Sequence, residues 1–169
     1  AVFGGYGMED AAQIAYLCLY ALQHRGQEAS GIVTSDRGRI YEHRDFGLVG
    51  KVYNREILAG LKGNMAIGHN RYSTMGLSTA ANIQPLLVDC KVGHIAVAHN
   101  GNLVNAVELR RRMEADGSIF RSTTDSEVIL HLIARSRAGT SDEMIADGLR
   151  QVEGAFSLVF LTKDKIIAA

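Results

Sequence analysis

The sequence predicts a layered α+β domain built on antiparallel sheets. Its 169 residues suit one compact domain that is large enough to bury a sizeable core. Segments with helical periodicity fall into groups along the chain, and between them lie short apolar runs joined by turn signals. Short turns join antiparallel neighbours, whereas parallel strands need long crossovers. Grouped helices and hairpin-joined strands therefore favour helices stacked on antiparallel sheets.

The first part of the chain is predicted to form a strand, a helix and a hairpin. Residues 2–3 precede a glycine pair and indicate a short strand, and residues 9–24 show helical spacing. Residues 30–34 and 39–43 flank an Asp-Arg-Gly turn, which predicts a hairpin. The apolar positions of the helix, which we expect to face the core, are Ile14, Leu17, Cys18, Ala21 and Leu22.

The middle of the chain is expected to carry polar side chains to the edges of a sheet. Residues 47–62 hold one short helix at most. Residues 65–69 and 94–99 are short apolar runs that end abruptly in polar clusters, a pattern typical of buried strands. Chemistry is therefore expected where these two strands end.

The last part of the chain is predicted to contain three helices and two strands. Residues 105–116 indicate a helix that ends at the following glycine. Thr124 and Glu127 form a capping box, which predicts a helix over residues 126–137. The other predicted elements are a helix over residues 144–152, a strand over residues 155–162 and a last strand after a turn at residues 163–165.

Composition and charge exclude several classes of function. Eighteen basic and eighteen acidic side chains give a formal net charge of zero, which argues against binding to nucleic acid or to anionic lipid. The chain has neither an apolar run that could span a membrane nor a signal peptide at its amino end, so we expect a cytoplasmic protein. Cys18 and Cys90 belong to no CxxC pair, so no metal site is expected and both are interpreted as structural thiols.

Four polar clusters are the candidate functional segments. Taken singly, each has a purely structural explanation. These are a cationic helix end in the first, an ion pair of Arg71 in the second, an Asn-Gly turn in the third and a helix-capping Asp125 in the fourth. The clusters lie at residues 22–28, 68–74, 99–105 and 123–127.

Together, the clusters fit one small ligand better than four unrelated features. A free amino acid with a side-chain amide needs an arginine for its α-carboxylate, a carboxylate for its α-ammonium group and donors at the amide oxygen. Arg71, Asp125, and the Asn100 side chain with the Gly101 backbone N–H match those three needs. The set contains no nucleophile, since neither cysteine adjoins a polar cluster.

These clusters, with Gln84-Pro85-Leu86, resemble the glutaminase domain of the amidophosphoribosyltransferases over essentially the whole chain. The run His-Arg-Gly-Gln-Glu at residues 24–28 differs from the corresponding runs of glucosamine-phosphate synthase and asparagine synthetase relatives. The resemblance implies a class II glutamine amidotransferase with the four-layer αββα sandwich of N-terminal-nucleophile hydrolases. It also implies that Arg25 and Gly26 lie beside the nucleophile, and that Tyr72 and nearby loop residues gate the site.

One departure from the family affects catalysis. Family members start Cys-Gly-Val-Phe-Gly or similarly, and that cysteine is the nucleophile, which places it one residue before Ala1. Trimming, a residue outside the printed sequence and an inactive chain remain open as explanations. The start without methionine and the end within an apolar run indicate a fragment. Residues 1–169 are therefore interpreted as a glutaminase domain truncated at both ends and without its phosphoribosyltransferase domain.

The resemblance implies an enzyme that hydrolyses glutamine and passes ammonia to phosphoribosyl pyrophosphate in the first step of purine synthesis. It implies no cofactor for this domain, Mg²⁺ for the phosphoribosyltransferase domain, and leaves an iron–sulfur cluster open. The implied partners are glutamine, the phosphoribosyltransferase domain of the same chain and further copies of the full-length enzyme. Two alternatives stay open: another class II amidotransferase, and a non-catalytic glutamine-binding module.

Overall fold

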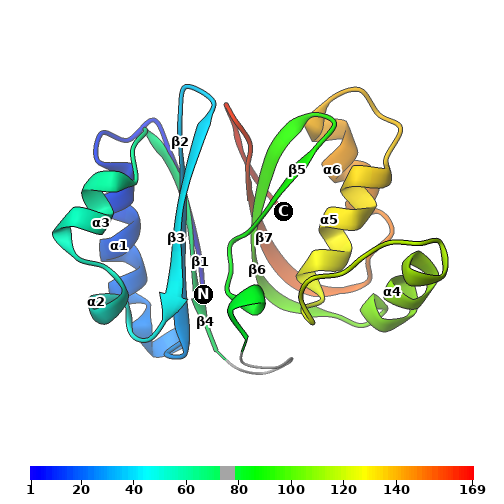
Figure 1. The fold of residues 1–169 in the computed structure, drawn as a ribbon, viewed down its shortest axis with the longest axis horizontal. Coiled ribbons are helices and arrows are strands. Elements are labelled where there is room, and N and C mark those ends of the chain that lie inside the picture. Colours follow the sequence, from blue (N-terminus) through cyan, green and yellow to red (C-terminus); the bar gives the residue numbers. More distant parts are fainter. Residues whose placement is uncertain (73–78) are drawn as a thin grey trace.

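The protein is a four-layer sandwich in which two antiparallel sheets face each other and helices cover both outer faces (Figure 1). The computed structural model describes residues 1–72 and 79–169. This arrangement confirms the predicted α+β class and the αββα layers. Within the described residues, no helix is long and apolar enough to cross a membrane.

The first sheet has the strand order β1-β4-β2-β3 and is antiparallel throughout. Its strands are β1 Val2–Tyr6, β2 Ala29–Asp36, β3 Arg39–Phe46 and β4 Met65–Arg71. Its helical layer comprises α1 Ala11–Ala21, α2 Val49–Val52 and α3 Arg55–Gly60, and the short 3₁₀ turn η1 Gln23–Arg25 follows α1.

The prediction of at most one short helix in residues 47–62 is wrong, because both α2 and α3 lie there. Asn54 explains the second one, because its side chain accepts a hydrogen bond from the Ile57 N–H at 2.8 Å and so caps α3.

Helix α1 packs on the sheet through a different face from the predicted one. Ile14 and Leu17 are 37% and 55% exposed, although the apolar spacing placed them in the core. The buried side chains are Ala11, Ala12, Ala15 and Leu19. A Cβ at Gly68 of β4 would lie 2.9 Å from Leu19 Cδ1, so the missing side chain allows close approach. Small residues on both sides bring the helix near the sheet and leave the larger side chains outside.

The second sheet has the strand order β5-β6-β7-β8. Its strands are β5 Leu86–Cys90, β6 Gly93–Leu103, β7 Gly154–Leu161 and β8 Ile166–Ala168, preceded by the 3₁₀ turn η2 Ala80–Asn82. Its helical layer comprises α4 Ala106–Ala115, α5 Ser126–Arg135 and α6 Ser141–Leu149. The expectation that the strand ends near residue 99 is wrong, because β6 continues through Asn100 and Gly101 to Leu103 while pairing with β7.

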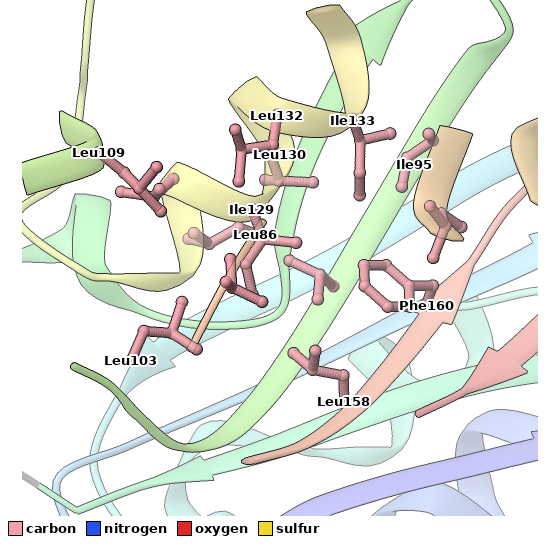
Figure 2. Packing of buried hydrophobic residues seen from close by; sticks show 14 of the residues in the cluster. Leu86, Ile95, Leu103, Leu109, Ile129, Leu130, Leu132, Ile133, Leu158 and Phe160 are labelled. Atoms are coloured by element: carbon pink, nitrogen blue, oxygen red, sulfur yellow. The ribbon is translucent and has the colours of Figure 1, made fainter. Parts of the chain in front are cut away.

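The main core lies between the second sheet and its helices. Ile129 and Ile133 of α5 point toward Phe160 and Leu158 of β7 (Figure 2).

The predicted capping box at the start of α5 is wrong. Asp125 occupies the N-cap position, and the Glu127 carboxylate instead accepts hydrogen bonds from the backbone N–H groups of residues 121 and 122 at 2.9 and 2.7 Å. A smaller cluster joins the two sheets: Val33, Met65, Ile67, Ala96, Ala98 and Leu161.

Candidate active site

A cavity of about 120 Å³ opens where the two sheets meet at the start of the chain. Its size suits a small metabolite and is too small for a dinucleotide. Residues from both sheets and from the start of α5 line it: Ala1, Arg25, His69, Asn70, Arg71, Tyr72, Gln84, His99, Asn100, Gly101, Asn102, Thr124 and Asp125. The structure thus brings the four polar clusters, which are far apart in sequence, to one place.

The first residue forms one wall of this cavity. The Ala1 amino group donates a hydrogen bond to the Asn70 carbonyl at 2.8 Å, and the register of β1 on β4 pairs Val2 with His69. Burial and, to a smaller extent, the Arg25 cation together lower the pKa of the Ala1 amino group to about 6. An amine in this environment is largely neutral at pH 7 and can accept a proton.

Gly26 does not line the cavity, in contrast to the other predicted site residues. It is buried, and a Cβ there would lie 2.6 Å from the Asn70 carbonyl oxygen. Its lack of a side chain lets the turn after η1 pass directly against β4. The close passage of Gly26 against β4 therefore lets the neighbouring Arg25 line the cavity.

Arg71 forms the ion pair that its sequence position suggested and also lines the cavity. Its side chain is only 7% exposed, and its Nε lies 3.2 Å from a Glu28 carboxylate oxygen. Its Nη1 donates a hydrogen bond to the Asn82 carbonyl at 2.7 Å. The guanidinium is thus held by a buried ion pair while the residue lines the cavity. These contacts fix the orientation of a planar group that binds carboxylates well.

Asp125 lies across the cavity at the start of α5. Its Oδ2 accepts a hydrogen bond from the Leu103 N–H at 3.0 Å, and its Oδ1 lies 3.5 Å from His99 Nδ1. Burial alone raises the pKa of this carboxyl, but the contacts with His99 and with backbone N–H groups outweigh burial and lower the pKa below its ordinary value. The side chain does not cap the helix, so the capping explanation is wrong and an ionised carboxylate is available beside the cavity.

Asn100 and Gly101 are exposed to the cavity within strand β6. The alternative explanation of this pair as a turn is wrong, because both residues pair with β7. Gly101 has a φ of 152°, and a Cβ there would clash with the Ala155 carbonyl oxygen. Only glycine fits here, which keeps the strand intact next to Asn100.

Tyr72 lies at the cavity mouth and is 66% exposed. Its proposed gating role stays a prediction, and residues 73–78 of the adjacent loop lie outside the described residues.

The sequence reasoning missed two histidines at the cavity. Burial lowers the pKa of His69 to about 3, with a further contribution from the nearby amino terminus, so its imidazole is neutral. His99 Nδ1 lies 2.9 Å from the Ser126 hydroxyl. Within the described part of the chain, His69 Nδ1 and His99 Nε2 are buried without a hydrogen-bond partner. Each histidine ends a predicted buried strand, and this position was the signal that could have identified them.

Neither cysteine is part of the cavity. Cys18 and Cys90 are free thiols of intermediate burial, on α1 and β5 respectively. Cys90 Sγ donates a weak hydrogen bond to the Gly93 carbonyl at 3.4 Å. The described residues contain no group of three or more histidine, cysteine or acidic side chains that could hold a metal ion.

The sequence is similar to glutamine amidotransferase domains and to amidophosphoribosyltransferases. Residues 69–169 match the family model of the glutamine amidotransferase domain. The chain is 51% identical over 169 residues to an amidophosphoribosyltransferase of Rhizobium etli and 46% identical over 167 residues to the chloroplastic amidophosphoribosyltransferase 3 of Arabidopsis thaliana. In each case 99% of this chain is aligned, but only 34% and 31% of the relative, so the chain spans about a third of their length.

Solved structures agree with these matches. The glutamine phosphoribosylpyrophosphate amidotransferase from B. subtilis, complexed with ADP and GMP, superposes with a TM-score of 0.93 at 43% identity. The superposition covers 99% of this chain and 36% of that one. A predicted glutamine amidotransferase from Pseudomonas aeruginosa shares the fold at a TM-score of 0.55 and 16% identity, over 83% of this chain and 59% of its own.

Proposed function

Because the chain belongs to the glutamine amidotransferase domain family, we propose that it hydrolyses the side-chain amide of glutamine as the glutaminase domain of an amidophosphoribosyltransferase. The observation that carries this proposal is the convergence of Ala1, Arg71, Asn100 and Asp125 on one cavity. A free amino acid with a side-chain amide explains why a cation, an amide donor and an anion surround the same small space beside the start of β1.

The proposed nucleophile is the thiol of a cysteine directly before Ala1 in the full protein. Its own α-amine accepts the thiol proton, since an α-amine has an ordinary pKa of about 7.7 to 8.0 and a useful fraction of it is neutral near pH 7. The thiolate attacks the amide carbon, and the Asn100 side chain with the Gly101 N–H stabilises the oxyanion. Ammonia leaves with the returned proton, and water then cleaves the thioester to release glutamate and regenerate the thiol.

The other end of glutamine meets two opposite charges. Arg71 binds the α-carboxylate and Asp125 the α-ammonium group, each through charge-assisted hydrogen bonds. Arg25 lines the side of the cavity nearest the nucleophile. The ion pair with Glu28 holds the Arg71 guanidinium in place, and the lowered pKa of Asp125 keeps its carboxylate ionised at neutral pH.

The remainder of the protein, by this proposal, uses the ammonia. A phosphoribosyltransferase domain with bound Mg²⁺ lets ammonia displace pyrophosphate from phosphoribosyl pyrophosphate and so forms phosphoribosylamine for purine synthesis. We further propose that the full-length enzyme is a homo-oligomer in the cytoplasm, where a nucleophilic thiol stays reduced.

Two variants of the full-length protein with its cysteine test the assignment. Arg71→Lys keeps the charge but loses the planar fork, so the glutamine KM is expected to rise about tenfold or more. Asn100→Ala is expected to lower kcat, because its amide acts on charge that develops in the transition state. Synthesis from free ammonia serves as the control. A fall of ammonia-dependent synthesis to the same extent would show that these residues support the fold and not glutamine chemistry.

A further inference from the structure

We propose that residues 82–84, here termed the amide brace, set the spacing between Arg71 and Asp125, and that Asn82 and Gln84 are positioning residues for recognition of the amino-acid end of the substrate. This inference rests on the proposed function, since it concerns the two groups assigned there to the α-carboxylate and the α-ammonium group. Asn82 and Gln84 themselves lie outside the four polar clusters. The residues of the proposed site that they contact lie within those clusters.

Asn82 contacts both sides of the proposed site. Its side chain is fully buried, and its backbone carbonyl accepts the hydrogen bond from Arg71 Nη1 at 2.7 Å. Its side-chain Nδ2 donates to Thr123 Oγ1 at 2.7 Å, and its Oδ1 accepts from the Thr123 N–H at 2.9 Å. Thr123 lies two residues before Asp125. One residue therefore connects the arginine of β4 to the loop that carries the carboxylate.

Gln84 holds the same loop from its other end. Its Nε2 donates to the Ser126 hydroxyl at 3.2 Å, and its Oε1 accepts from the His99 N–H at 2.7 Å. Ser126 follows Asp125 and is fully buried, and His99 precedes Asn100 in β6. Asp125 is thus bracketed by two buried amides, and the second amide also fixes the strand that carries the oxyanion donor.

The brace is itself held against the first sheet. Arg44 Nη1 of β3 donates to the carbonyls of Ile83 and Pro85 at 2.8 and 3.1 Å. Opposite it, a Cβ at Gly31 of β2 would clash with the Gln84 carbonyl oxygen, so the brace lies directly on the strand. Because it is fixed on the sheet behind it, the brace can act as a spacer between the groups in front of it.

Spacing matters because the α-carboxylate and α-ammonium groups of an amino acid are bonded to the same carbon. Charge-assisted hydrogen bonds to both groups form together only if the arginine and the carboxylate stand at one fixed separation. The brace therefore governs binding of the amino-acid end, whereas the attack on the amide depends on Asn100 and the nucleophile. Loss of the brace should affect ligands that carry both α-groups and spare reagents that carry neither.

The test uses full-length protein with its amino-terminal cysteine and two alkylating reagents. A diazoketone analogue of glutamine carries both α-groups, and iodoacetamide carries neither. For Asn82→Ala we expect alkylation of that cysteine by the diazoketone to slow about tenfold, which corresponds to about 1.4 kcal/mol, with the iodoacetamide rate within twofold of the parent. The glutamine KM should rise with little change in kcat. Thr123→Val removes only the hydroxyl that Asn82 contacts, at an exposed position, and should give a smaller shift of the same kind.

The matched control is Asn105→Ala. Asn105 also bridges two segments, because its side chain donates to the Gln151 carbonyl and accepts from the Glu153 N–H, but it does not line the cavity. It should leave both alkylation rates unchanged. Equal slowing with both reagents in Asn82→Ala and Thr123→Val, or no slowing with either, would overturn the brace. If the parent protein itself showed no preference for the diazoketone and no glutaminase activity, the proposed function would fail first.

Discussion

The two halves of the sandwich bury their helices in different ways. In the first half, α1 contacts the sheet through Ala11, Ala12, Ala15 and Leu19 and leaves Leu17 on the outside. In the second half, α5 buries large aliphatic side chains in the core between the sheet and the other helices: Val128, Ile129, Leu130, Leu132 and Ile133. The first half thus brings backbones close together, whereas the second fills space with side-chain volume.

This difference shows what a hydrophobic pattern can and cannot predict. Apolar spacing identifies the buried face where large residues occupy it, as in α5. It fails in α1, because the buried alanines of the helix and the missing side chain of Gly68 beneath Leu19 let the helix approach the sheet, and larger side chains such as Leu17 lie outside. The four predictions below test this contrast and the junction between the halves, from the largest expected effect to the smallest.

Phe160→Ala should have the largest effect on stability. Phe160 is fully buried in the second-half core, so its truncation removes apolar contacts and leaves a cavity that costs about 3 to 5 kcal/mol. Phe46→Ala in the first half is the control, because Phe46 is 44% exposed and its loss should cost no more than about 0.5 kcal/mol. Urea unfolding of both variants measures the contrast. Similar losses would show that the two halves do not differ as described.

Acidification should weaken the junction through His69. Its pKa falls from 6.5 in the unfolded chain to about 3 on folding, because burial disfavours the imidazolium. Below pH 6.5 the unfolded chain binds a proton that the folded state does not, so stability decreases as pH falls, by about 1.4 kcal/mol per pH unit. Between pH 6.5 and 4.5 this amounts to about 2.3 kcal/mol, because the unfolded imidazole is only half protonated at the start of this range. Urea unfolding of His69→Gln over the same range should show a shallower dependence on pH, and an unchanged slope would rule out His69 as the cause.

Ala15→Leu should destabilise the close helix–sheet contact of the first half. Ala15 is fully buried on α1, and three added carbons force the helix away from the sheet at a cost of about 1 to 3 kcal/mol. Ala21→Leu, on the same helix at an exposed position, is the matched control and should be nearly neutral. Thermal unfolding reports both changes. Equal melting temperatures for the two variants would contradict the close packing.

Leu17→Ser should have the smallest effect. Leu17 has the same apolar character as the core leucines but is 55% exposed, so its replacement should change the free energy of unfolding by no more than about 0.5 kcal/mol. Urea unfolding of this variant and of Ala15→Leu under the same conditions measures the two changes in free energy. A loss above about 2 kcal/mol, as expected for a buried leucine, would show that Leu17 is packed in the core as the apolar spacing predicted.

Much of the fold followed from local patterns. The hairpin of β2 and β3, the strand β4 and the helices α4 and α5 lie close to their predicted ranges, and α6 begins and ends three residues before its predicted range. The four polar clusters also pointed to a shared ligand, because an arginine, an aspartate and an Asn-Gly pair at element ends match the charges of an amino acid. The elements could be predicted because each depends on residues close together in the chain, and the shared ligand because the residue types of the separate clusters complement one amino acid.

Only the tertiary structure decided how those groups are held. No local pattern indicated that Asn82 joins Arg71 to Thr123, that Glu127 binds backbone N–H groups in place of a helix cap, or that burial lowers the pKa of His69. Each of these facts depends on partners that are not neighbours along the chain, or on burial between the two sheets. Residue types and spacing set which chemistry is possible, but distances, desolvation and the buried helix face arise only when separate elements pack together.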